Sequence, residues 1–360
     1  MAAKPVRFGV VGAGYWGPNL IRNLTELPSA ELVVVADLEE ERLDRVSTRH
    51  PTVRTTTNAS DLLDLGIDAV VIATPPATHY ALGKMFLANG VHCLIEKPLA
   101  TSVEAALELT ALANRRGVQL MTGHTYLYAS AVRELKRLID NGDLGDVFYI
   151  DSVRTNLGVF QLKTDAMWDL APHDISIVNY LLGSSPVSVT AHAGSFVMKS
   201  VGINDLVYLH LEYPSGRLAN IRVSWLDPHK TRRTTVVGNK KMVVYDDVQT
   251  AEQLRIYDRG AVVNAIPESF GEFQFSYRHG DVVIPHLLME EPLRVECREF
   301  VDAIRTGIPP YSDGNFGIGV VEALAAGQRS LKLARSVSLE EVRRDGMELQ
   351  ARTAVPSTSA

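Results

Sequence analysis

The chain has 360 residues, which is enough for about two domains of ordinary size. Its hydrophobic share of 46% excludes a wholly disordered or low-complexity chain and allows a sizeable core. The net charge of -6 and the lack of a clustered basic stripe argue against nucleic-acid binding.

Short apolar runs alternate with amphipathic stretches in the first third of the chain. The runs are continuously apolar, which is typical of parallel strands buried on both faces. We therefore expect an N-terminal α/β domain, residues 1–122, with a doubly wound parallel sheet of the Rossmann type. The expected strands are 8–11, 32–36, 69–73, 91–95 and 118–121, and the expected helices are 19–27, 39–48, 80–88 and 103–115.

The pattern changes after Gly123, where helices are followed by strands of alternating polarity. This pattern predicts an α+β domain, residues 123–335, with a large open and mostly antiparallel sheet that includes a hairpin turn at Pro214–Gly216. Residues 336–360 lack a core-forming pattern, and we expect a partly disordered tail. The expected helices are 131–140, 171–182, 292–306 and 316–334, and the expected strands are 187–192, 206–213, 217–225, 234–237 and 241–245.

A complete G-x-G-x-x-G motif follows the first expected strand and opens the first helix. Gly12 permits a tight turn, Gly14 lets the backbone approach a pyrophosphate, and Gly17 allows close packing of helix on strand. Asp37 follows the next strand, 20 residues after Gly17, where a carboxylate accepts hydrogen bonds from an adenosine ribose. The glycines could serve only as a turn, but this context favours a dinucleotide site.

The charge next to this motif predicts which dinucleotide binds. A 2'-phosphate would meet the negative Asp37, and residues 38–40 include no Arg to accommodate it. We therefore predict NAD as the cofactor, with NADP less favoured. Tyr15 and Trp16, inside the glycine loop, could cover the pyrophosphate or the nicotinamide, although Trp16 could equally belong to the helix core.

A second group of polar residues follows two neighbouring strands of the expected parallel sheet. Thr74, Pro75 and His79 follow one strand, and Glu96 and Lys97 begin an E-K-P motif after the next. Open α/β sheets bind ligands at the carboxyl ends of their strands. A Glu-Lys dipeptide is most often solvated, but these charges adjoin a buried strand, which favours a site.

A third group is the acid and imidazole in the segment WDLAPHDIS. Asp169 and His173 are four residues apart around Pro172, a residue that suits the first turn of a helix. At this spacing the carboxylate can orient the imidazole and raise its basicity, which makes a plausible proton-transfer pair. The alternative is a capped helix start, with Asp169 as the N-cap and His173 as a buried structural residue.

These motifs, together and in this order, resemble the Gfo/Idh/MocA family of glucose-fructose oxidoreductase, inositol dehydrogenase and related sugar dehydrogenases. The resemblance extends from Arg7 to about Ala334 and includes T-P-x-x-x-H, E-K-P, Leu-Gly-Asp-Val at 144–147 and D-x-x-x-H. It implies nicotinamide-dependent oxidation or reduction of a secondary alcohol on a sugar or cyclitol.

The resemblance also implies roles for individual residues. Lys97 matches the lysine that polarises the substrate hydroxyl, and His173 matches the histidine that takes the proton of that hydroxyl. Asp169 matches the acid that binds substrate or tunes the basicity of the histidine. The predicted cofactor-binding residues are Gly12, Gly14, Tyr15, Trp16, Gly17, Asp37, Thr74, Pro75, His79, Glu96 and Lys97, and the predicted substrate-binding residues are Lys97, His124, Tyr126, Arg154, Asn156, Asp169 and His173.

Four of the predicted substrate residues have alternative interpretations. His124 and Tyr126 follow the last expected Rossmann strand and could line the substrate pocket, although Tyr126 could instead belong to interdomain packing. Arg154 and Asn156 end a strand and could meet a substrate phosphate or hydroxyl, but exposed strand-end polar residues are more common.

Two departures from the family pattern put the substrate in doubt. Residues 164–168 replace a run of glycines found in many members, and Gly123-His124-Thr125 stands where many read G-x-N. The segment around Asp169 and His173 resembles members of nucleotide-sugar pathways, which implies oxidation at C3 of a UDP-linked hexosamine. The alternatives are an inositol or free-sugar dehydrogenase, a redox-assisted glycoside-cleaving enzyme and a non-catalytic nicotinamide-binding regulator.

The remaining expectations concern partners and compartment. The partners we expect are a small-molecule sugar or nucleotide-sugar and, through the open sheet, further copies of the chain in a homodimer or homotetramer. The histidines lack ligand-like spacing, so we expect no metal site. Two cysteines among apolar neighbours fit a reducing cytoplasm, and no apolar stretch approaches the roughly 18 to 20 residues of a membrane span.

Overall fold

The computed structural model describes residues 4–263 and 275–353, which form two compact units. The first, called here the N-terminal unit, consists of Met1–Tyr128, Glu290–Ala325 and Glu340–Ala360. The second, called the sheet unit, consists of Ala129–Met289 and Ala326–Leu339. The chain thus returns to the N-terminal unit after the sheet unit, so neither unit is one continuous stretch of sequence.

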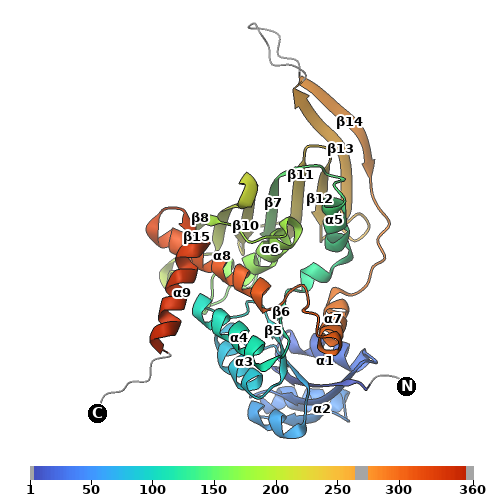
Figure 1. Cartoon of the computed structure of the whole chain (residues 1–360), viewed down its shortest axis with the longest axis vertical. Helices are drawn as coiled ribbons and strands as arrows, with labels where there is room; N and C mark the ends of the chain where they lie inside the picture. The colour runs from blue at the N-terminus through green and yellow to red at the C-terminus, as the bar shows by residue number, and fades with distance from the viewer. Residues whose placement is uncertain (1–3, 264–274, 354–360) are drawn as a thin grey trace. The chain divides into compact units, whose positions relative to one another are not determined.

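A six-stranded parallel sheet forms the centre of the N-terminal unit, with the strand order β3-β2-β1-β4-β5-β6. Figure 1 labels two of these strands, β5 and β6, and the four helices α1 to α4 of this unit. All four residues of β4 are buried, as expected for a central strand covered on both faces. The expected doubly wound α/β sheet is confirmed. Its strands are β1 (Val6–Val11), β2 (Ala30–Ala36), β3 (Arg54–Thr56), β4 (Ala69–Ile72), β5 (His92–Glu96) and β6 (Leu120–Gly123), and the helices between them are α1 (Gly17–Glu26), α2 (Glu40–Arg49), α3 (His79–Ala88) and α4 (Val103–Arg116).

The short edge strand β3 was not among the expected strands. It consists of Arg-Thr-Thr, none of which is buried, and it pairs only with β2 in the strand order. An edge position does not require an apolar run, so hydrophobicity gave no signal there.

The sheet unit contains a nine-stranded sheet with the order β14-β13-β12-β11-β7-β10-β9-β8-β15. All of its neighbouring strands are antiparallel except β7 and β10, which run parallel. The expected open, mostly antiparallel sheet is confirmed, and Pro214–Gly216 does connect β9 with β10. The strands are β7 (Val147–Thr155), β8 (Ser188–Gly194), β9 (Leu206–Glu212), β10 (Leu218–Ser224), β11 (Thr231–Gly238), β12 (Met242–Asp246), β13 (Leu254–Val263), β14 (Phe275–Val283) and β15 (Val337–Ser338).

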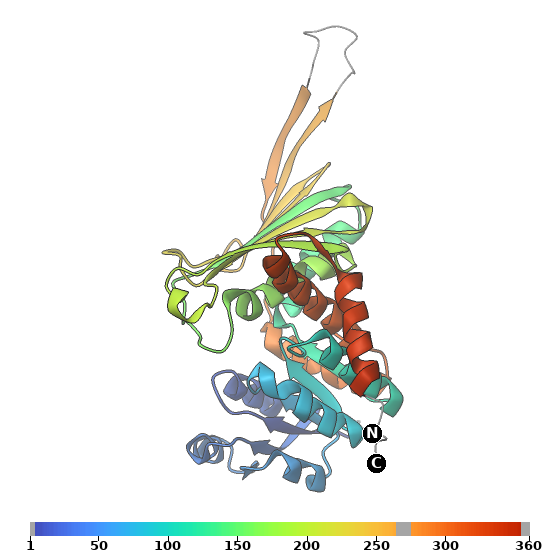
Figure 2. The same ribbon diagram turned by 90° about the vertical axis from the view of Figure 1, so that its left-hand side faces the viewer.

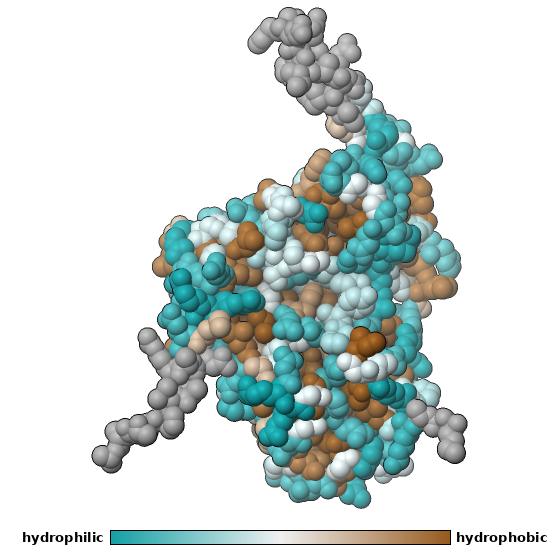
Figure 3. All heavy atoms as spheres, viewed as in Figure 1, coloured by the Kyte–Doolittle hydropathy of each residue, from teal (hydrophilic) through white to brown (hydrophobic). Residues whose placement is uncertain are grey.

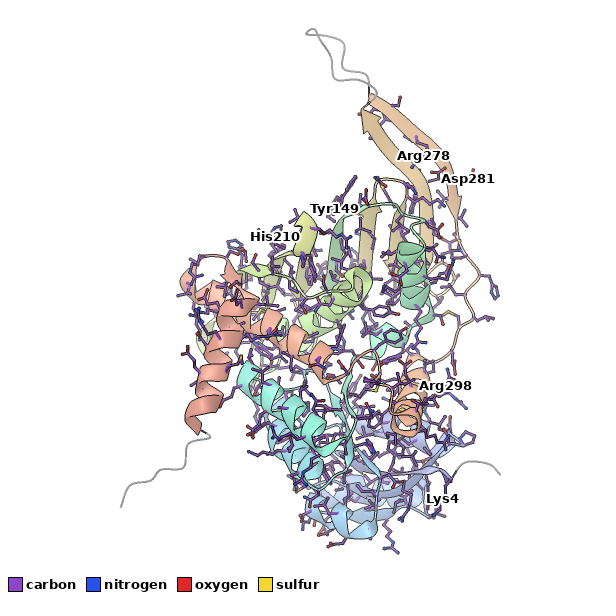
Figure 4. The ribbon with its side chains drawn as sticks, in the orientation of Figure 1. Lys4, Tyr149, His210, Arg278, Asp281 and Arg298 are labelled. Atoms are coloured by element: carbon purple, nitrogen blue, oxygen red, sulfur yellow. The ribbon has the colours of Figure 1, made fainter. Side chains whose placement is uncertain are left out.

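Strands β13 and β14 form a hairpin that extends beyond the other strands of its sheet (Figure 2). The sequence analysis did not predict these two strands. Their residues include charged side chains such as Arg278 and Asp281, which Figure 4 labels on β14, and every residue from 276 to 283 is exposed. Among the side chains of β13 that the structure describes, only Leu254 and Ile256 are buried, so the hairpin has too short an alternating apolar pattern to reveal it.

The two faces of the nine-stranded sheet differ. Helix α6 (Ala166–Leu182) packs on β7, β9 and β10, and α5 (Ser130–Asp140) packs on β12. Figure 3 shows the side of the molecule with these helices, where hydrophilic and apolar residues are intermixed. On the other face, strand positions that point away from the core carry exposed or half-buried side chains, among them Tyr149 and His210, labelled in Figure 4.

Three further helices follow the hairpin. Helix α7 (Pro292–Thr306) belongs to the N-terminal unit, and α8 (Gly314–Leu333) begins in that unit and ends in the sheet unit. Helix α9 (Leu339–Thr353) lies in the segment where the sequence predicted a partly disordered tail, and its Leu339 and Val342 are buried. The last residues of that expected tail, 354–360, lie outside the described part of the chain.

Candidate functional site

The glycine loop between β1 and α1 is built for close approach of backbone. Gly12 has a φ of +102°, and a Cβ there would lie 2.6 Å from the Ala73 carbonyl oxygen at the end of β4. A Cβ at Gly17 would lie 2.1 Å from the Gly12 carbonyl oxygen. Both positions therefore require glycine, as they do where this motif lets the backbone approach a pyrophosphate at the start of a helix.

Asp37 lies at the carboxyl end of β2 and is held by the glycine loop. The Ala13 N–H donates to its Oδ2 at 2.7 Å, and the Glu39 N–H donates to its Oδ1 at 2.9 Å. Only 8% of Asp37 is exposed. The carboxylate is therefore fixed next to the glycines, as a ribose-binding acid must be.

Arg42 was missed in the sequence analysis. Its guanidinium lies 3.5 Å from Asp37 Oδ1 and 2.8 Å from Glu39 Oε1, and it is 3.5 Å from the position a Cβ would take at Gly14. The sequence signal was available, because Arg42 is in the first turn of α2, two residues after Glu40. A cation thus lies beside the acid on which the NAD preference was based.

The two aromatic residues of the loop differ in environment. Tyr15 is 97% exposed and Trp16 is 36% exposed at the N-cap of α1, so Trp16 is not a helix-core residue. The Trp16 indole donates a hydrogen bond to the Glu96 carboxylate. This bond links the glycine loop with the loop that follows β5.

His79 connects the two loops that follow β4 and β5. It is fully buried, with Nδ1 2.9 Å from the Pro98 carbonyl oxygen and Nε2 2.8 Å from the Thr74 carbonyl oxygen. Burial lowers the pKa of His79 against the raising effect of these two carbonyls. The neutral ring donates to one of them, so His79 supports the shape of both loops, while Thr74 is half-buried and Pro75 exposed.

Glu96 ends strand β5, Lys97 follows it, and both residues are half-buried. The carboxyl group of Glu96 lies over Gly123, where a Cβ would be 3.1 Å from it, and its Oε1 is shielded from solvent. Burial raises the pKa of Glu96 to about 7, against the lowering effects of the Lys97 charge, the Lys97 N–H and the Trp16 indole. Glu96 is therefore poised to gain or lose a proton near neutral pH.

His124 follows β6 and is buried, with 1% exposed. Its ring packs edge-on against Phe316 at a centroid distance of 5.7 Å, and neither ring nitrogen has a partner among the described residues. Burial, with a further contribution from Lys97, lowers the pKa of His124 to about 3, so the ring is neutral at pH 7. Tyr126, two residues later, is half-buried in the short 3-10 turn Thr125–Tyr128.

Asp169 and His173 lie on α6, but the helix does not start where the sequence suggested. It begins at Ala166 with Asp165 as its N-cap, whose side chain accepts from the Trp168 N–H at 2.9 Å. The alternative in which Asp169 is the N-cap is therefore wrong, and Pro172 lies inside the helix instead of in its first turn. The error arose because the Ala-Met-Trp turn before Asp169 lacks the apolar periodicity of the rest.

The acid of this pair is oriented from the neighbouring sheet. The indole Nε1–H of Trp225, just after β10, donates to Asp169 Oδ2 at 3.0 Å. His173 lies one helical turn further along, on the same face of α6, and is half-buried like Asp169. The proposed proton-transfer pair is thus on a rigid helix, with one carboxylate oxygen fixed by an indole.

Arg154 is buried, so the alternative that it is an exposed polar residue at a strand end is wrong. It is 5% exposed, and its Nε lies 2.6 Å from Oδ2 of the buried Asp174. Ser152 Oγ donates to the other oxygen of Asp174 at 2.7 Å and lies 3.0 Å from Thr234 Oγ1. Arg154 therefore holds α6 on the sheet, while Asn156 is half-buried just after β7.

Each unit gathers its own part of the predicted site. The N-terminal unit brings together the glycine loop, Asp37 and the loops after β4 and β5, and the sheet unit carries Asp169 and His173 on α6. Sequence reasoning missed Glu296, a fully buried acid on α7 that interacts with Glu96. Across residues 4–263 and 275–353, no cluster of three or more His, Cys, Asp or Glu side chains could hold a metal ion.

Strand order, glycine loop and ribose-binding acid together define a dinucleotide-binding oxidoreductase. The oxidoreductase family with an NAD-binding Rossmann fold, Gfo/Idh/MocA, matches residues 6–124, and the C-terminal domain of the same family matches residues 132–244. These two regions cover more than half of the chain, which therefore belongs to the Gfo/Idh/MocA family, as its motifs indicated. NAD is the cofactor for which the residues of the glycine loop are arranged.

Individual relatives extend over most of the chain. UDP-N-acetylglucosamine 3-dehydrogenase of Acidithiobacillus ferrooxidans is 28% identical over 88% of this chain and 95% of its own length. The scyllo-inositol 2-dehydrogenase (NAD(+)) of Bacillus subtilis is 26% identical over 85% of this chain and 88% of its own. The crystal structure of GenD2 from gentamicin A biosynthesis, in complex with NAD, is 26% identical, with a TM-score of 0.77 and coverage of 93% and 97% of the two chains.

Helices in the described ranges were also compared with the length and hydropathy of a membrane span. None of them is long and apolar enough to cross a bilayer.

Proposed function

We propose that this NAD-dependent oxidoreductase oxidises the C3 hydroxyl of a nucleotide-linked sugar. The observation that carries the reaction type is the Asp169–His173 pair on one face of α6, with Asp169 held by the Trp225 indole. A regulator that only binds nicotinamide has no need of such a pair. The substrate class rests on the similarity to UDP-N-acetylglucosamine 3-dehydrogenase over almost its whole length.

In the proposed reaction the residues of the two units have separate tasks. NAD, when bound, accepts a hydride from the substrate carbon. The Lys97 ammonium binds the hydroxyl and stabilises the negative charge that develops on its oxygen. His173 accepts the hydroxyl proton, and Asp169 keeps the imidazole oriented and stabilises it once it is protonated.

The remaining site residues would position the ligands. We propose that Thr74, Pro75 and His79 shape the loop that borders the cofactor, and that Tyr15 and Trp16 cover it. We propose that His124, buried and neutral, binds substrate, because its two ring nitrogens offer one donor and one acceptor without a partner among the described residues. Tyr126 and Asn156 remain proposed substrate-binding residues, whereas the buried Arg154 would act through its contact with Asp174 and so fix α6.

A second candidate substrate is a polyol or free sugar. The similarity to scyllo-inositol 2-dehydrogenase favours it, because that relative is also matched over most of its length. The two candidate substrates differ in one group, because only the nucleotide-linked sugar contains a diphosphate.

The test is turnover against a panel of UDP-linked hexosamines, inositols and unsubstituted sugars, read as NADH formation. We expect kcat/KM for the best nucleotide-sugar to exceed that for any inositol by at least about tenfold, since the diphosphate adds binding contacts. The reverse order would contradict the proposed substrate class. Release of an aglycone without NADH accumulation would instead favour the glycoside-cleaving alternative.

We also propose that the exposed face of the nine-stranded sheet joins copies of the chain into a homodimer or homotetramer. Tyr208 on β9 and Tyr149 on β7 are 47% and 43% exposed on this face, among polar residues such as His210. A mixture of aromatic and polar side chains is typical of protein interfaces. A monomer at micromolar concentration by light scattering would contradict this proposal.

A further inference from the structure

Two carboxylic acids lie in the interior of the N-terminal unit. Glu96 ends β5, and Glu296 lies on α7, the helix on which Figure 4 labels Arg298. Glu296 is fully buried, and its Oε2 accepts from Thr125 Oγ1 at 2.8 Å. The Oε1 atoms of both acids are shielded from solvent and have no hydrogen-bond partner among the described residues. Glu96 and Glu296 are called the carboxyl pair below.

This arrangement is costly if both acids are ionised, because two negative charges would share a site with little water. Burial and the neighbouring Glu96 raise the pKa of Glu296 well above its ordinary value. A single proton relieves the repulsion and also supplies a donor for the oxygens that lack partners. At neutral pH the carboxyl pair therefore holds at least one proton.

Other charged and titratable groups around the carboxyl pair are few. Lys97, after β5, favours ionisation of Glu96, and Glu299, on α7, opposes ionisation of Glu296. Cys297, also on α7, is buried with its pKa raised well above the ordinary value, so it remains a neutral thiol. Lys97 is thus the cation that acts on the pair.

The carboxyl pair is connected to the cofactor loop. Glu96 accepts a hydrogen bond from Trp16 in the glycine loop, and its carboxyl lies 3.1 Å from where a Cβ at Gly123 would be. In a Rossmann sheet the dinucleotide crosses from the adenosine side, marked here by Asp37 on β2, to the opposite half of the sheet. Glu96 ends β5 in that opposite half, where the nicotinamide of a bound dinucleotide would lie.

We propose that the carboxyl pair is a proton-holding device whose protonation follows the charge of the nicotinamide. Binding of NAD⁺, whose ring is cationic, stabilises the ionised pair, and one proton passes to solvent. Binding of NADH, whose ring is neutral, leaves the proton in place. When the ring becomes neutral during alcohol oxidation, the pair takes one proton back from solvent. Glu96 and Glu296 are positioning residues in this account, because they act on the cofactor through charge.

This inference rests on the cofactor and not on the proposed substrate. It is tested by calorimetric titration of the enzyme with NAD⁺ and, separately, with NADH, at pH 7 in two buffers of different ionisation enthalpy. We expect NAD⁺ binding to release about half a proton or more and NADH binding to release much less. We also expect the affinity for NAD⁺ relative to NADH to rise several-fold, up to about tenfold, from pH 6 to pH 8. Release of the same number of protons on binding of NAD⁺ and of NADH would overturn the proposal.

The variant Glu296→Gln tests whether the proton released on NAD⁺ binding comes from the carboxyl pair. Glutamine keeps the shape and can donate to Glu96, but it has no proton to release. We expect the difference in proton release between NAD⁺ and NADH to fall by at least half. The matched control is Asp302→Asn, which removes one negative charge from an exposed position of the same helix and should leave the difference in place. An unchanged difference in Glu296→Gln would overturn the proposal.

A second variant and a cofactor-free measurement cover the case in which Glu296→Gln does not fold. Thr125→Val removes the hydroxyl that donates to Glu296, so the ionised pair is less stable and proton release should move to higher pH. Infrared spectra of the unliganded enzyme between pH 6 and pH 9 should show a protonated carboxyl that disappears as pH rises. Absence of that band at pH 6, or no movement in Thr125→Val, would contradict the proposal even if no sugar is turned over.

Discussion

Each unit of the molecule contains a pair of ionisable side chains with atoms shielded from solvent, Arg154 with Asp174 and Glu96 with Glu296, and the two pairs are opposite in kind. In the sheet unit, Arg154 and Asp174 carry opposite charges and contact at 2.6 Å. In the N-terminal unit, Glu96 and Glu296 carry like charges, and one oxygen of each has no partner among the described residues. The first pair is complete within the protein, whereas the second needs a proton or a cationic ligand. We infer that the first serves stability and the second serves the cofactor.

The largest effect should come from breaking the opposite-charge pair. Arg154→Met leaves Asp174 buried without its cation, so we expect the free energy of unfolding to fall by about 3–5 kcal/mol in urea titrations. The double variant Arg154→Met/Asp174→Leu removes both charges and should recover most of that loss. A loss below about 1 kcal/mol in the single variant would mean that this pair is not the stability element described here.

The next effect separates catalysis from stability. Lys97→Ala and His173→Ala each remove one proposed chemical role, and each should lower kcat by about 10²-fold or more. Affinity for NADH, measured by fluorescence titration, should remain nearly unchanged in both. His50→Ala, at the end of α2, serves as the control and should keep full turnover. If His173→Ala retains more than about a third of wild-type turnover, His173 is a packing residue.

The acid at the end of β2 should produce a smaller effect, on cofactor choice. Asp37→Ala removes the ribose acceptor and releases Arg42, which lies 3.5 Å from it. We expect NADH to bind about tenfold more weakly and the difference between NADH and NADPH to narrow, because a cation remains for a 2'-phosphate. Binding of NADPH to the wild-type enzyme at least about tenfold more tightly than NADH would contradict the assignment.

The smallest expected effect is a change of thermal stability with pH that depends on Glu296. The pKa of Glu296 in the folded protein is raised, so its contribution to stability is present at low pH and is lost as pH rises through that pKa. Glu296→Gln has no such loss. Between pH 6 and pH 9 we expect the Tm of the wild type to fall by about 2 °C or more relative to the variant in thermal scans. Parallel Tm curves would show that Glu296 does not change its ionisation on folding.

The N-terminal unit was largely predictable because its site follows local sequence rules. Each of its motifs stands at the end of a strand that the hydrophobic pattern reveals. These motifs are the glycine motif, the acid at position 37 and the E-K-P motif. Glu296 could not be found in this way, because it lies 200 residues after Glu96 on a helix whose sequence looks like an ordinary amphipathic surface. Only the folded chain brings the two acids together.

The sheet unit was predicted less well, for a different reason. Its alternating strands were recognised, but among the described side chains of the hairpin only Leu254 and Ile256 of β13 are buried, and residues 276–283 of β14 are all exposed, so the alternating apolar run is too short to reveal two strands. Arg154 was expected at a strand end, and its burial depends on Asp174 from a helix that packs on the sheet. Side chains whose role is set by a partner far away in sequence carry no local signal.

Hydride transfer from C3 of a nucleotide-linked sugar to NAD⁺ can be followed directly by isotope transfer. UDP-N-acetylglucosamine deuterated at C3 is incubated with the enzyme and NAD⁺, and the NADH is examined by mass spectrometry. We predict one deuterium on the nicotinamide ring and a 3-keto nucleotide-sugar as the partner product. NADH without deuterium, or NADH formed only with an inositol, would contradict the claim.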